Sequence, residues 1–128
     1  MIFFSAPLNP VPFCRPAQSG RRRFNNPRYS AFKDQFALFA LRAMRGRNPF
    51  TGAIKITADF YKARPKKTKH HCGDFAIAPS VGDVDNFLKA VLDALNGICY
   101  VDDSQVVDAH ARKFFGIPHI EVRLEEIK

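Results

Sequence analysis

Residues 53 to 61 alternate between apolar and polar side chains, and this pattern constrains the fold more than any other feature of the chain. One side of the alternation carries only apolar residues, Ile54, Ile56, Ala58 and Phe60, and the other carries Lys55, Thr57 and Asp59. Successive side chains of a β-strand point to opposite faces of a sheet. The segment therefore predicts a strand with one buried face.

Two other segments repeat their apolar residues at helical spacing. The first begins at about Pro27 or Ser30, ends near residues 45 to 47, and carries the stripe Phe32, Phe36, Phe39, Ala40 and Ala43. The second covers residues 86 to 95, with the stripe Val84, Phe87, Leu88, Val91, Leu92 and Leu95, and stops at Asn96-Gly97. Steps of three and four residues place apolar side chains on one face of a helix. Both segments are predicted to be amphipathic helices.

Three further strands are expected, at residues 2 to 5, 105 to 115 and 119 to 124. The last two are joined near Gly116 to Pro118, and we expect them to pair as a hairpin. The stretches at about 7–27 and 62–80 are rich in basic and turn-forming residues, which predicts two basic loops. The resulting order is βαβαββ. A length of 128 residues fits a single α+β domain built on a small mixed sheet with two helices.

Charge is distributed unevenly along the chain. The net charge is +8, yet residues 83 to 108 hold six of the 12 acidic residues and a single basic one, Lys89. A local negative pole in a basic protein fits a cation-binding site surrounded by a surface that attracts polyanions such as nucleic acid. The alternative is that these aspartates cap helices and turns. Charge alone does not decide between the two.

Several other classes of protein do not fit the sequence. No apolar run is long enough to span a membrane, and the first residues lack the basic and apolar regions of a signal peptide, so we expect a cytoplasmic protein. Three scattered cysteines indicate reduced thiols rather than a disulfide framework. The run His70, His71 and Cys72 suggests zinc, but other ligands at metal-site spacing are absent.

The acidic segment has the chemistry of a magnesium site. Asp83 and Asp85 are separated by one residue just before the second helix, so a turn or extended backbone there aims both carboxylates to one side. A third carboxylate, from Asp102 or Asp103, must return along a helix about 15 Å long, which is feasible for the residues between. Mg²⁺ held by such carboxylates assists the hydrolysis of phosphodiesters.

Lys89 lies one helical turn beyond Asp85 and on the same face. Its ammonium group has the charge needed to neutralise a phosphate oxygen or the charge that develops in the transition state. An ordinary ion pair with Asp85 or Asp93 is the alternative, because residues four apart on a helix are neighbours. Asp93 itself is expected on the solvated face of the helix.

The segment GDVDNFLKAVLDALNG, followed by YVDDSQVVD, resembles the RusA-like Holliday junction resolvases. Their motif runs D-x-D-N, a lysine four residues after the second Asp, D-A-L, and then D-D-x-Q-V, and each part occurs here in order. The resemblance implies that Asp83, Asp85 and Asp103 bind Mg²⁺, or Mn²⁺ in its place, and that Lys89 is a catalytic or phosphate-contacting base. It also implies a homodimer that nicks symmetry-related strands of a four-way DNA junction, in a bacterial or phage-encoded protein.

Contacts with DNA are expected from the two basic loops, through Arg21, Arg22, Arg23, Lys66, Lys67 and Lys69. Such side chains bind the phosphate backbone without reading sequence. Stacking of Phe13, Phe24 or Phe75 on unpaired bases is a weaker expectation than packing of these rings in the core. Two other functions compete with a resolvase: a phosphatase of the D-x-D type, and a non-cutting module that binds branched DNA. Residues 78 to 80, Ala-Pro-Ser, argue against the phosphatase, which places its motif after an apolar strand.

Overall fold

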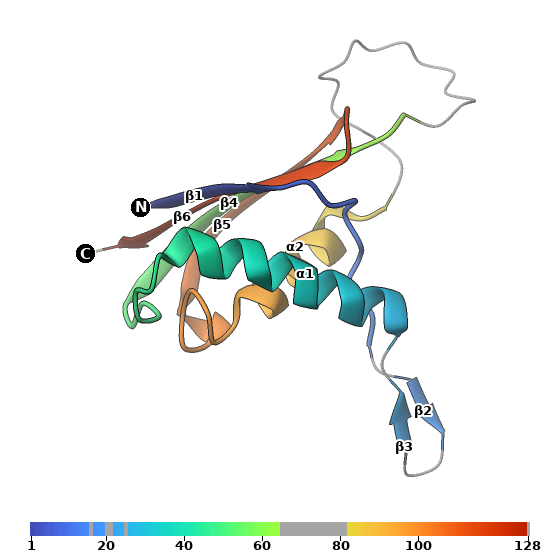
Figure 1. Cartoon of the computed structure of the whole chain (residues 1–128), viewed down its shortest axis with the longest axis horizontal. Coiled ribbons are helices and arrows are strands. Elements are labelled where there is room, and N and C mark those ends of the chain that lie inside the picture. The colour runs from blue at the N-terminus through green and yellow to red at the C-terminus, as the bar shows by residue number, and fades with distance from the viewer. Residues whose placement is uncertain (16, 20–21, 25, 65–81, 128) are drawn as a thin grey trace.

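The computed structural model describes residues 1–15, 17–19, 22–24, 26–64 and 82–127, with the backbone alone for 17–19 and 22–24. The described part consists of one four-stranded sheet, two long helices and a small separate hairpin (Figure 1). The elements in chain order are β1 (Ile2–Ala6), β2 (Ala17–Ser19), β3 (Arg22–Phe24), α1 (Pro27–Met44), β4 (Ala53–Lys62), α2 (Val84–Leu95), the 3₁₀ turn η1 (Asp103–Gln105), β5 (Val106–Phe115) and β6 (His119–Ile127).

The main sheet is mixed, with the strand order β1-β6-β4-β5. β4 is central: it pairs in parallel with β5 on one side and antiparallel with β6 on the other, and β6 also pairs antiparallel with β1. Leaving the small hairpin aside, the order βαβαββ confirms the predicted α+β class. The helices α1 and α2 and the four strands of the main sheet all lie within a few residues of the predicted bounds.

Two expectations were wrong in detail. β5 and β6 follow each other in the chain but do not form a hairpin, because β4 lies between them and pairs with both. The segment expected to be one basic loop at 7–27 contains β2 and β3, which pair antiparallel and project from the domain beside the start of α1 (Figure 1). Of the loop expected at about 62–80, Lys62 is the last residue of β4, and residues 65–81 lie outside the described part.

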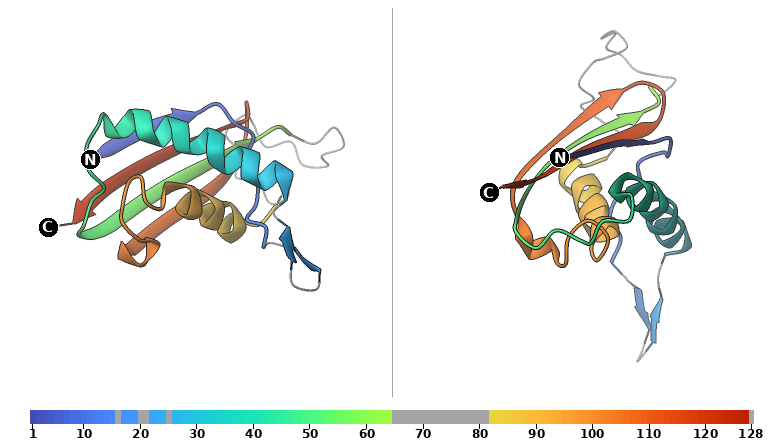
Figure 2. Two further views of the ribbon diagram at one scale, coloured as in Figure 1. Left: turned by 60° about the horizontal axis from the view of Figure 1, so that its bottom comes forward. Right: turned by 60° about the vertical axis from the view of Figure 1, so that its left-hand side comes forward.

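Both helices lie on the same face of the main sheet (Figure 2). That face is the apolar side of the alternating segment, where Ile54, Ile56, Ala58 and Phe60 are buried. α1 contributes Phe32, Phe36 and Met44 to the same core, and α2 contributes Phe87 and Val91. Lys55, Thr57 and Asp59 point to the opposite face, which no described helix covers. One face of the sheet is therefore buried against the helices, as the alternation of apolar and polar residues predicted.

Local side-chain chemistry sets the ends of α1. The side chain of Asn26 accepts hydrogen bonds from the backbone N–H groups of Arg28 and Tyr29, and Pro27 occupies the first turn. Proline suits this position because its fixed φ matches the helix and no N–H is needed there. At the other end Arg45 adopts φ +52°, a left-handed conformation that terminates the helix.

The chain reverses after α2 and then crosses directly to β5. Gly97, with φ +82°, donates its N–H to the Tyr100 carbonyl, and the buried Tyr100 hydroxyl donates to the Leu92 carbonyl at 2.6 Å. The Gln105 amide then donates to the carbonyls of Phe50 and Gly52, at 2.8 and 2.9 Å, just before β4 begins. These bonds fix η1 at the end of the sheet where β4 and β5 start.

Candidate functional site

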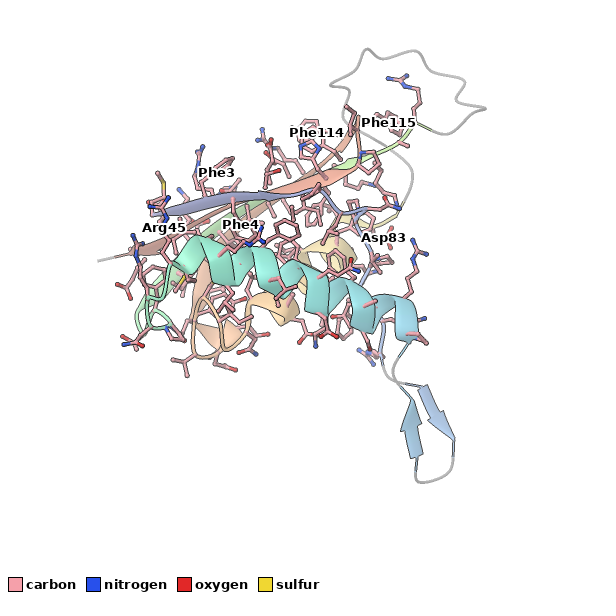
Figure 3. All side chains as sticks on the ribbon, viewed as in Figure 1. Phe3, Phe4, Arg45, Asp83, Phe114 and Phe115 are labelled. Carbon is pink, nitrogen blue, oxygen red and sulfur yellow. The ribbon has the colours of Figure 1, made fainter. Side chains whose placement is uncertain are left out.

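Two carboxylates stand exposed at the beginning of α2. Asp83 is the N-cap residue and Asp85 lies in the first turn (Figure 3 labels Asp83). An aspartate at this position usually accepts a hydrogen bond from a helix N–H group, but the Asp83 side chain makes no such bond. Neither carboxylate forms an ion pair with a described residue. Both remain available for a cation, with the positive end of the helix dipole behind them.

The backbone before Asp83 is held in a conformation that only glycine adopts easily. Gly82 has φ +111°, and a Cβ built on it would lie 2.5 Å from the ring of Phe87. The Gly82 carbonyl also accepts a hydrogen bond from the Lys113 ammonium at the far end of β5. The glycine thus lets the chain pass closely over Phe87, and this passage sets the position of Asp83 relative to β5.

Lys89 does not form the ordinary helix ion pair. Its Nζ lies 4.2 Å from the centre of the Phe13 ring, a cation–π contact. Phe13 is fixed in turn by its backbone N–H, which donates to the Asn86 carbonyl at 2.9 Å. Lys89 is therefore held at the same end of α2 as Asp85, with its charge not consumed by an ion pair to a described carboxylate.

Asp93 is not the solvated helix residue that we expected. Its carboxylate accepts a hydrogen bond from the Tyr29 hydroxyl at 2.7 Å and forms an ion pair with Lys33 at 3.0 Å. Tyr29 and Lys33 both belong to α1. Burial alone would raise the pKa of Asp93, but the bonds from Tyr29 and Lys33 outweigh it and hold the pKa below its usual value. Asp93 ties the two helices together. The expectation failed because helical spacing does not show which neighbouring helix packs beside a polar stripe.

Two lysines that the sequence reasoning missed lie near the start of α2. Lys113 bonds the Gly82 carbonyl, and Lys62 lies with its Nζ 5.5 Å from the Phe87 ring centre and 3.4 Å from the Pro10 carbonyl. Burial, and then the charge of Arg28, lower the pKa of Lys62. A signal for both was present: each is a lysine on the apolar side of an alternating strand. Lysines at such positions lie on the core-facing side of the sheet, near Gly82 and Phe87.

Asp102 is the N-cap residue of η1 and Asp103 is its first residue, and the two carboxylates differ in their partners. Asp102 accepts a hydrogen bond from the Ser104 N–H at 3.1 Å, while its own N–H donates to the Gln105 side chain at 2.9 Å. The bonds from Ser104 hold the pKa of Asp102 below its usual value. This reciprocal arrangement is a capping box. Asp102 is therefore structural, and Asp103 is exposed with no described ion pair.

The structure does not bring Asp103 to Asp83 and Asp85. α2 has 12 residues, and a helix of that length is about 18 Å long. The strand pairing agrees: Val106 lies beside Ile54, whereas Lys113 lies beside Phe60, a separation of roughly 20 Å along a strand. Among the described residues no group of three or more His, Cys, Asp or Glu side chains is arranged to hold a metal ion. The chain presents a pair of carboxylates at one end of α2 and a third at the other.

The other expected contacts fall largely outside the described side chains. Arg21, Lys66, Lys67 and Lys69 lie in undescribed positions, as do His70, His71, Cys72 and Phe75, and for Arg22, Arg23 and Phe24 the structure describes only the backbone of β3. Phe13 is described, and its ring packs edge-on against Tyr29 at 5.5 Å and under Lys89. This ring is engaged within the protein. The cysteines that are described, Cys14 and Cys99, are both free thiols.

None of the helices in the described part of the chain is long and apolar enough to cross a membrane.

Comparison with known proteins places the chain among nucleases. A family model described as endodeoxyribonuclease RusA matches residues 7–125, a span that includes both helices and the complete acidic segment. The chain is also similar to the uncharacterized protein YqaN of Bacillus subtilis (strain 168), with 32% identity over 137 aligned residues covering 98% of this chain and 96% of YqaN.

Proposed function

The chain belongs to the RusA endodeoxyribonuclease family, and on this basis we propose that it is a Mg²⁺-dependent endonuclease that resolves four-way DNA junctions by paired, symmetric nicks. The observation that carries the proposal is the pair of exposed carboxylates at the start of α2, Asp83 and Asp85, with Lys89 and Lys113 close by. Carboxylates and cations placed side by side suit a phosphodiester and the metal ion that accompanies it.

The donor set fits magnesium. Mg²⁺ prefers carboxylate oxygens, keeps several water ligands and is commonly bound by one or two carboxylates together with phosphate oxygens of the substrate. Asp83 and Asp85 supply two such oxygen donors, and neither is used in a described ion pair. Mn²⁺ has the same preference for oxygen and would fit the same groups. Bound there, the ion supplies charge neutralisation at the phosphate and an activated water.

The lysines of this site act on the substrate. Lys89, held over the Phe13 ring, would contact a non-bridging phosphate oxygen and stabilise the charge that develops on it. Lys113 is tied to the Gly82 carbonyl next to Asp83, so its charge lies near one of the carboxylates that would hold the ion. Beyond the acidic segment the chain is strongly basic, which attracts DNA to the site and makes the affinity dependent on salt.

A homodimer would complete the site. Asp103 lies roughly 20 Å from Asp83 in its own subunit, judged from the strand between them, whereas ligand oxygens lie about 2.1 Å from Mg²⁺. One Asp103 therefore cannot join its own Asp83 and Asp85 on one ion. We assign the third carboxylate of each site to the partner's Asp103. Two sites shared between two subunits suit a four-way junction, because one two-fold axis then sets the spacing of both nicks.

The test compares purified wild-type protein with Asp83→Asn, Asp85→Asn and Asp103→Asn variants on a synthetic four-way junction and on a linear duplex. We expect the wild type to nick the junction when Mg²⁺ is present and not when it is chelated. Each variant should bind the junction but fail to nick it. Asp34→Asn, which removes an exposed acid from α1, is the matched control and should nick as the wild type does.

Nicking by Asp103→Asn at the wild-type rate would overturn the assignment of that residue. Equal binding of junction and duplex would replace the resolvase by a general nuclease. Junction binding with no nicking by the wild type in Mg²⁺ or Mn²⁺ would instead identify a non-cutting protein that binds branched DNA.

A further inference from the structure

We propose that Lys62 and Arg28 form a second phosphate-binding site, beside the metal site, which holds the DNA backbone at a phosphate near the one that is cut. The inference rests on the proposed function, because it names the part of the DNA substrate that these two cations would hold. Neither residue belongs to the acidic segment, so their contribution to DNA binding can be measured separately from the cutting of the strand.

Lys62 carries a positive charge that no described acid neutralises. Its Nζ lies 3.4 Å from the Pro10 carbonyl oxygen and 5.5 Å from the centre of the Phe87 ring, and it forms no ion pair with a described residue. An ammonium group has more N–H donors than this one carbonyl accepts. A partly buried charge is costly unless a group of opposite sign accompanies it. The surroundings of Lys62 therefore favour an anion.

Arg28 brings a second positive charge to the same place. It lies in the first turn of α1 and is exposed. The pKa of Lys62 is lowered first by burial and then by the charge of Arg28, so the two cations lie close together. They come from separate elements, β4 and α1, and neither has an ion pair with a described acid. A phosphate between them would relieve their mutual repulsion.

This pair of cations lies next to the carboxylates that would hold the metal ion. The Phe87 N–H donates to the Asp83 carbonyl at 3.2 Å, and the Phe87 ring packs against Gly82. Lys62 lies beside the same ring. The ends of β4 and β5 and the starts of α1 and α2 are on one side of the molecule (Figure 1). A DNA strand bound at Asp83 therefore passes close to Lys62.

Lys62 and Lys89 contact the same short segment of the chain. Lys62 bonds the Pro10 carbonyl, and Lys89 lies over the Phe13 ring. Three residues of chain span at most about 10 Å, and one DNA strand advances about 3.4 Å per nucleotide along the helix axis. A few nucleotides of one strand therefore match the spacing. With Lys89 at the phosphate that is cut and Lys62 and Arg28 at a neighbouring one, the direction of the strand across the metal site is fixed.

The competing explanation gives Lys62 a structural role, in which it ties the segment at Pro10 to β4. Its loss would then lower the free energy of unfolding and leave the affinity for DNA unchanged. An ion pair between Lys62 and Asp74, the one acidic residue outside the described part, would have the same consequence. Measurements of stability and of DNA binding on the same variants separate these roles from a phosphate site.

The experiment measures the affinity for a synthetic four-way junction by fluorescence anisotropy, with EDTA present so that no strand is cut. Lys62→Met keeps a long unbranched side chain beside Phe87 but removes the charge, and Lys62→Arg keeps the charge. Arg28→Gln removes the second charge at an exposed position. Lys55→Met is the matched control, because it removes a lysine from the same strand on the opposite face of the sheet. Urea unfolding shows whether each variant keeps its stability.

We expect Lys62→Met and Arg28→Gln each to raise the junction dissociation constant about tenfold at low salt. Each should also reduce the steepness of log affinity against log salt by about 0.9, the value for one phosphate contact. Lys62→Arg should keep most of the affinity, and Lys55→Met should change it little. In Mg²⁺ both weakened variants should show a higher KM with kcat near the wild-type value, because a phosphate away from the broken bond is held equally in the ground state and the transition state.

Wild-type affinity and salt dependence in either Lys62→Met or Arg28→Gln would overturn the paired site. A Lys62→Met variant that loses stability yet binds as the wild type does would assign Lys62 the structural role, and the same loss in Asp74→Asn would identify an ion pair between them. If Lys62→Met does not fold, Arg28→Gln decides.

The same measurements keep this site and the proposed function apart. If the variants lose affinity as expected but the wild type never nicks the junction, the proposed function fails and the phosphate site stands. If the wild type nicks the junction and either variant binds normally, the phosphate site fails and the proposed function stands. A wild type that binds neither junction nor duplex would overturn both.

Discussion

Replacing Tyr29 with phenylalanine removes one hydroxyl group and tests how the two helices are held together. The Tyr29 hydroxyl donates to Asp93 at 2.7 Å, and the tyrosine is only 6% exposed. A hydrogen bond to an ionised group contributes about 1.5–3 kcal/mol. The Asp93 side chain is 35% exposed and keeps its ion pair with Lys33, so solvent and Lys33 compensate in part. We expect Tyr29→Phe to lower the free energy of unfolding by about 1.5 kcal/mol at neutral pH, the lower end of that range.

The effect should depend on pH in a defined direction. The pKa of Asp93 is lower in the folded protein than its usual value. Burial raises this pKa, but the bonds from Tyr29 and Lys33 lower it by more. A carboxyl whose pKa is depressed by folding adds stability above its unfolded pKa, about 3.9, and loses this contribution as the pH falls through the folded pKa. The difference between wild type and Tyr29→Phe should therefore narrow on acidification below about pH 4.

Urea unfolding curves at neutral pH and at the lowest pH where the fold survives measure both effects. Tyr61→Phe is the matched control, because the Tyr61 ring stacks on Phe114 and His119 while its hydroxyl has no hydrogen-bond partner among the described residues. That control should change stability by less than about 0.5 kcal/mol. A loss for Tyr29→Phe as small as the control's, or a loss that does not vary with pH, would refute the role given to the Tyr29–Asp93 bond.

Three further predictions concern the elements that position the acidic segment. Gly82→Ala should destabilise the start of α2 and reduce junction nicking without changing any charge, because its Cβ would meet the Phe87 ring at 2.5 Å; wild-type nicking and melting temperature would contradict this. Gln105→Ala removes donors from the carbonyls of Phe50 and Gly52 and should lower the free energy of unfolding by about 1–3 kcal/mol in urea titrations; an unchanged midpoint would contradict this. Burial raises the pKa of Cys99 to about 11, so a thiol reagent at pH 8 should label Cys99 only after unfolding, as peptide mapping will show.

Periodicity predicted the elements well because it reflects local physics. The alternation around Ile56 and the stripe around Val91 each record which side of an element faces the core, and both were confirmed. Partner choice among strands could not be predicted in the same way. β5 and β6 adjoin in sequence, yet both pair with β4, which lies between them in the sheet and buries its apolar face. This contact is non-local, and the pattern of each strand says nothing about it.

The same difference between local and non-local contacts explains which parts of the candidate site were predicted. The position of Asp83 and Asp85 at the start of a helix follows from residues close together in sequence, and it was predicted. The position of Asp103 depends on the route of the chain after Gly97. There the Tyr100 hydroxyl donates a hydrogen bond to the Leu92 carbonyl. The sequence allowed a return along the helix, but the chain crosses to β5 instead. Only the structure showed that the third carboxylate lies at the other end of α2.

The central claim, that each site joins Asp83 and Asp85 of one subunit to the partner's Asp103, is tested most directly by mixing two inactive variants. Asp83→Asn and Asp103→Asn proteins are unfolded together, refolded as a mixture and incubated with Mg²⁺ and a four-way junction. A mixed dimer then has one site with all three carboxylates and one site that lacks two. We predict that the mixture nicks one strand of the junction, although neither variant alone nicks any. A mixture as inactive as its components, with mixed dimers shown to form, would contradict the shared site.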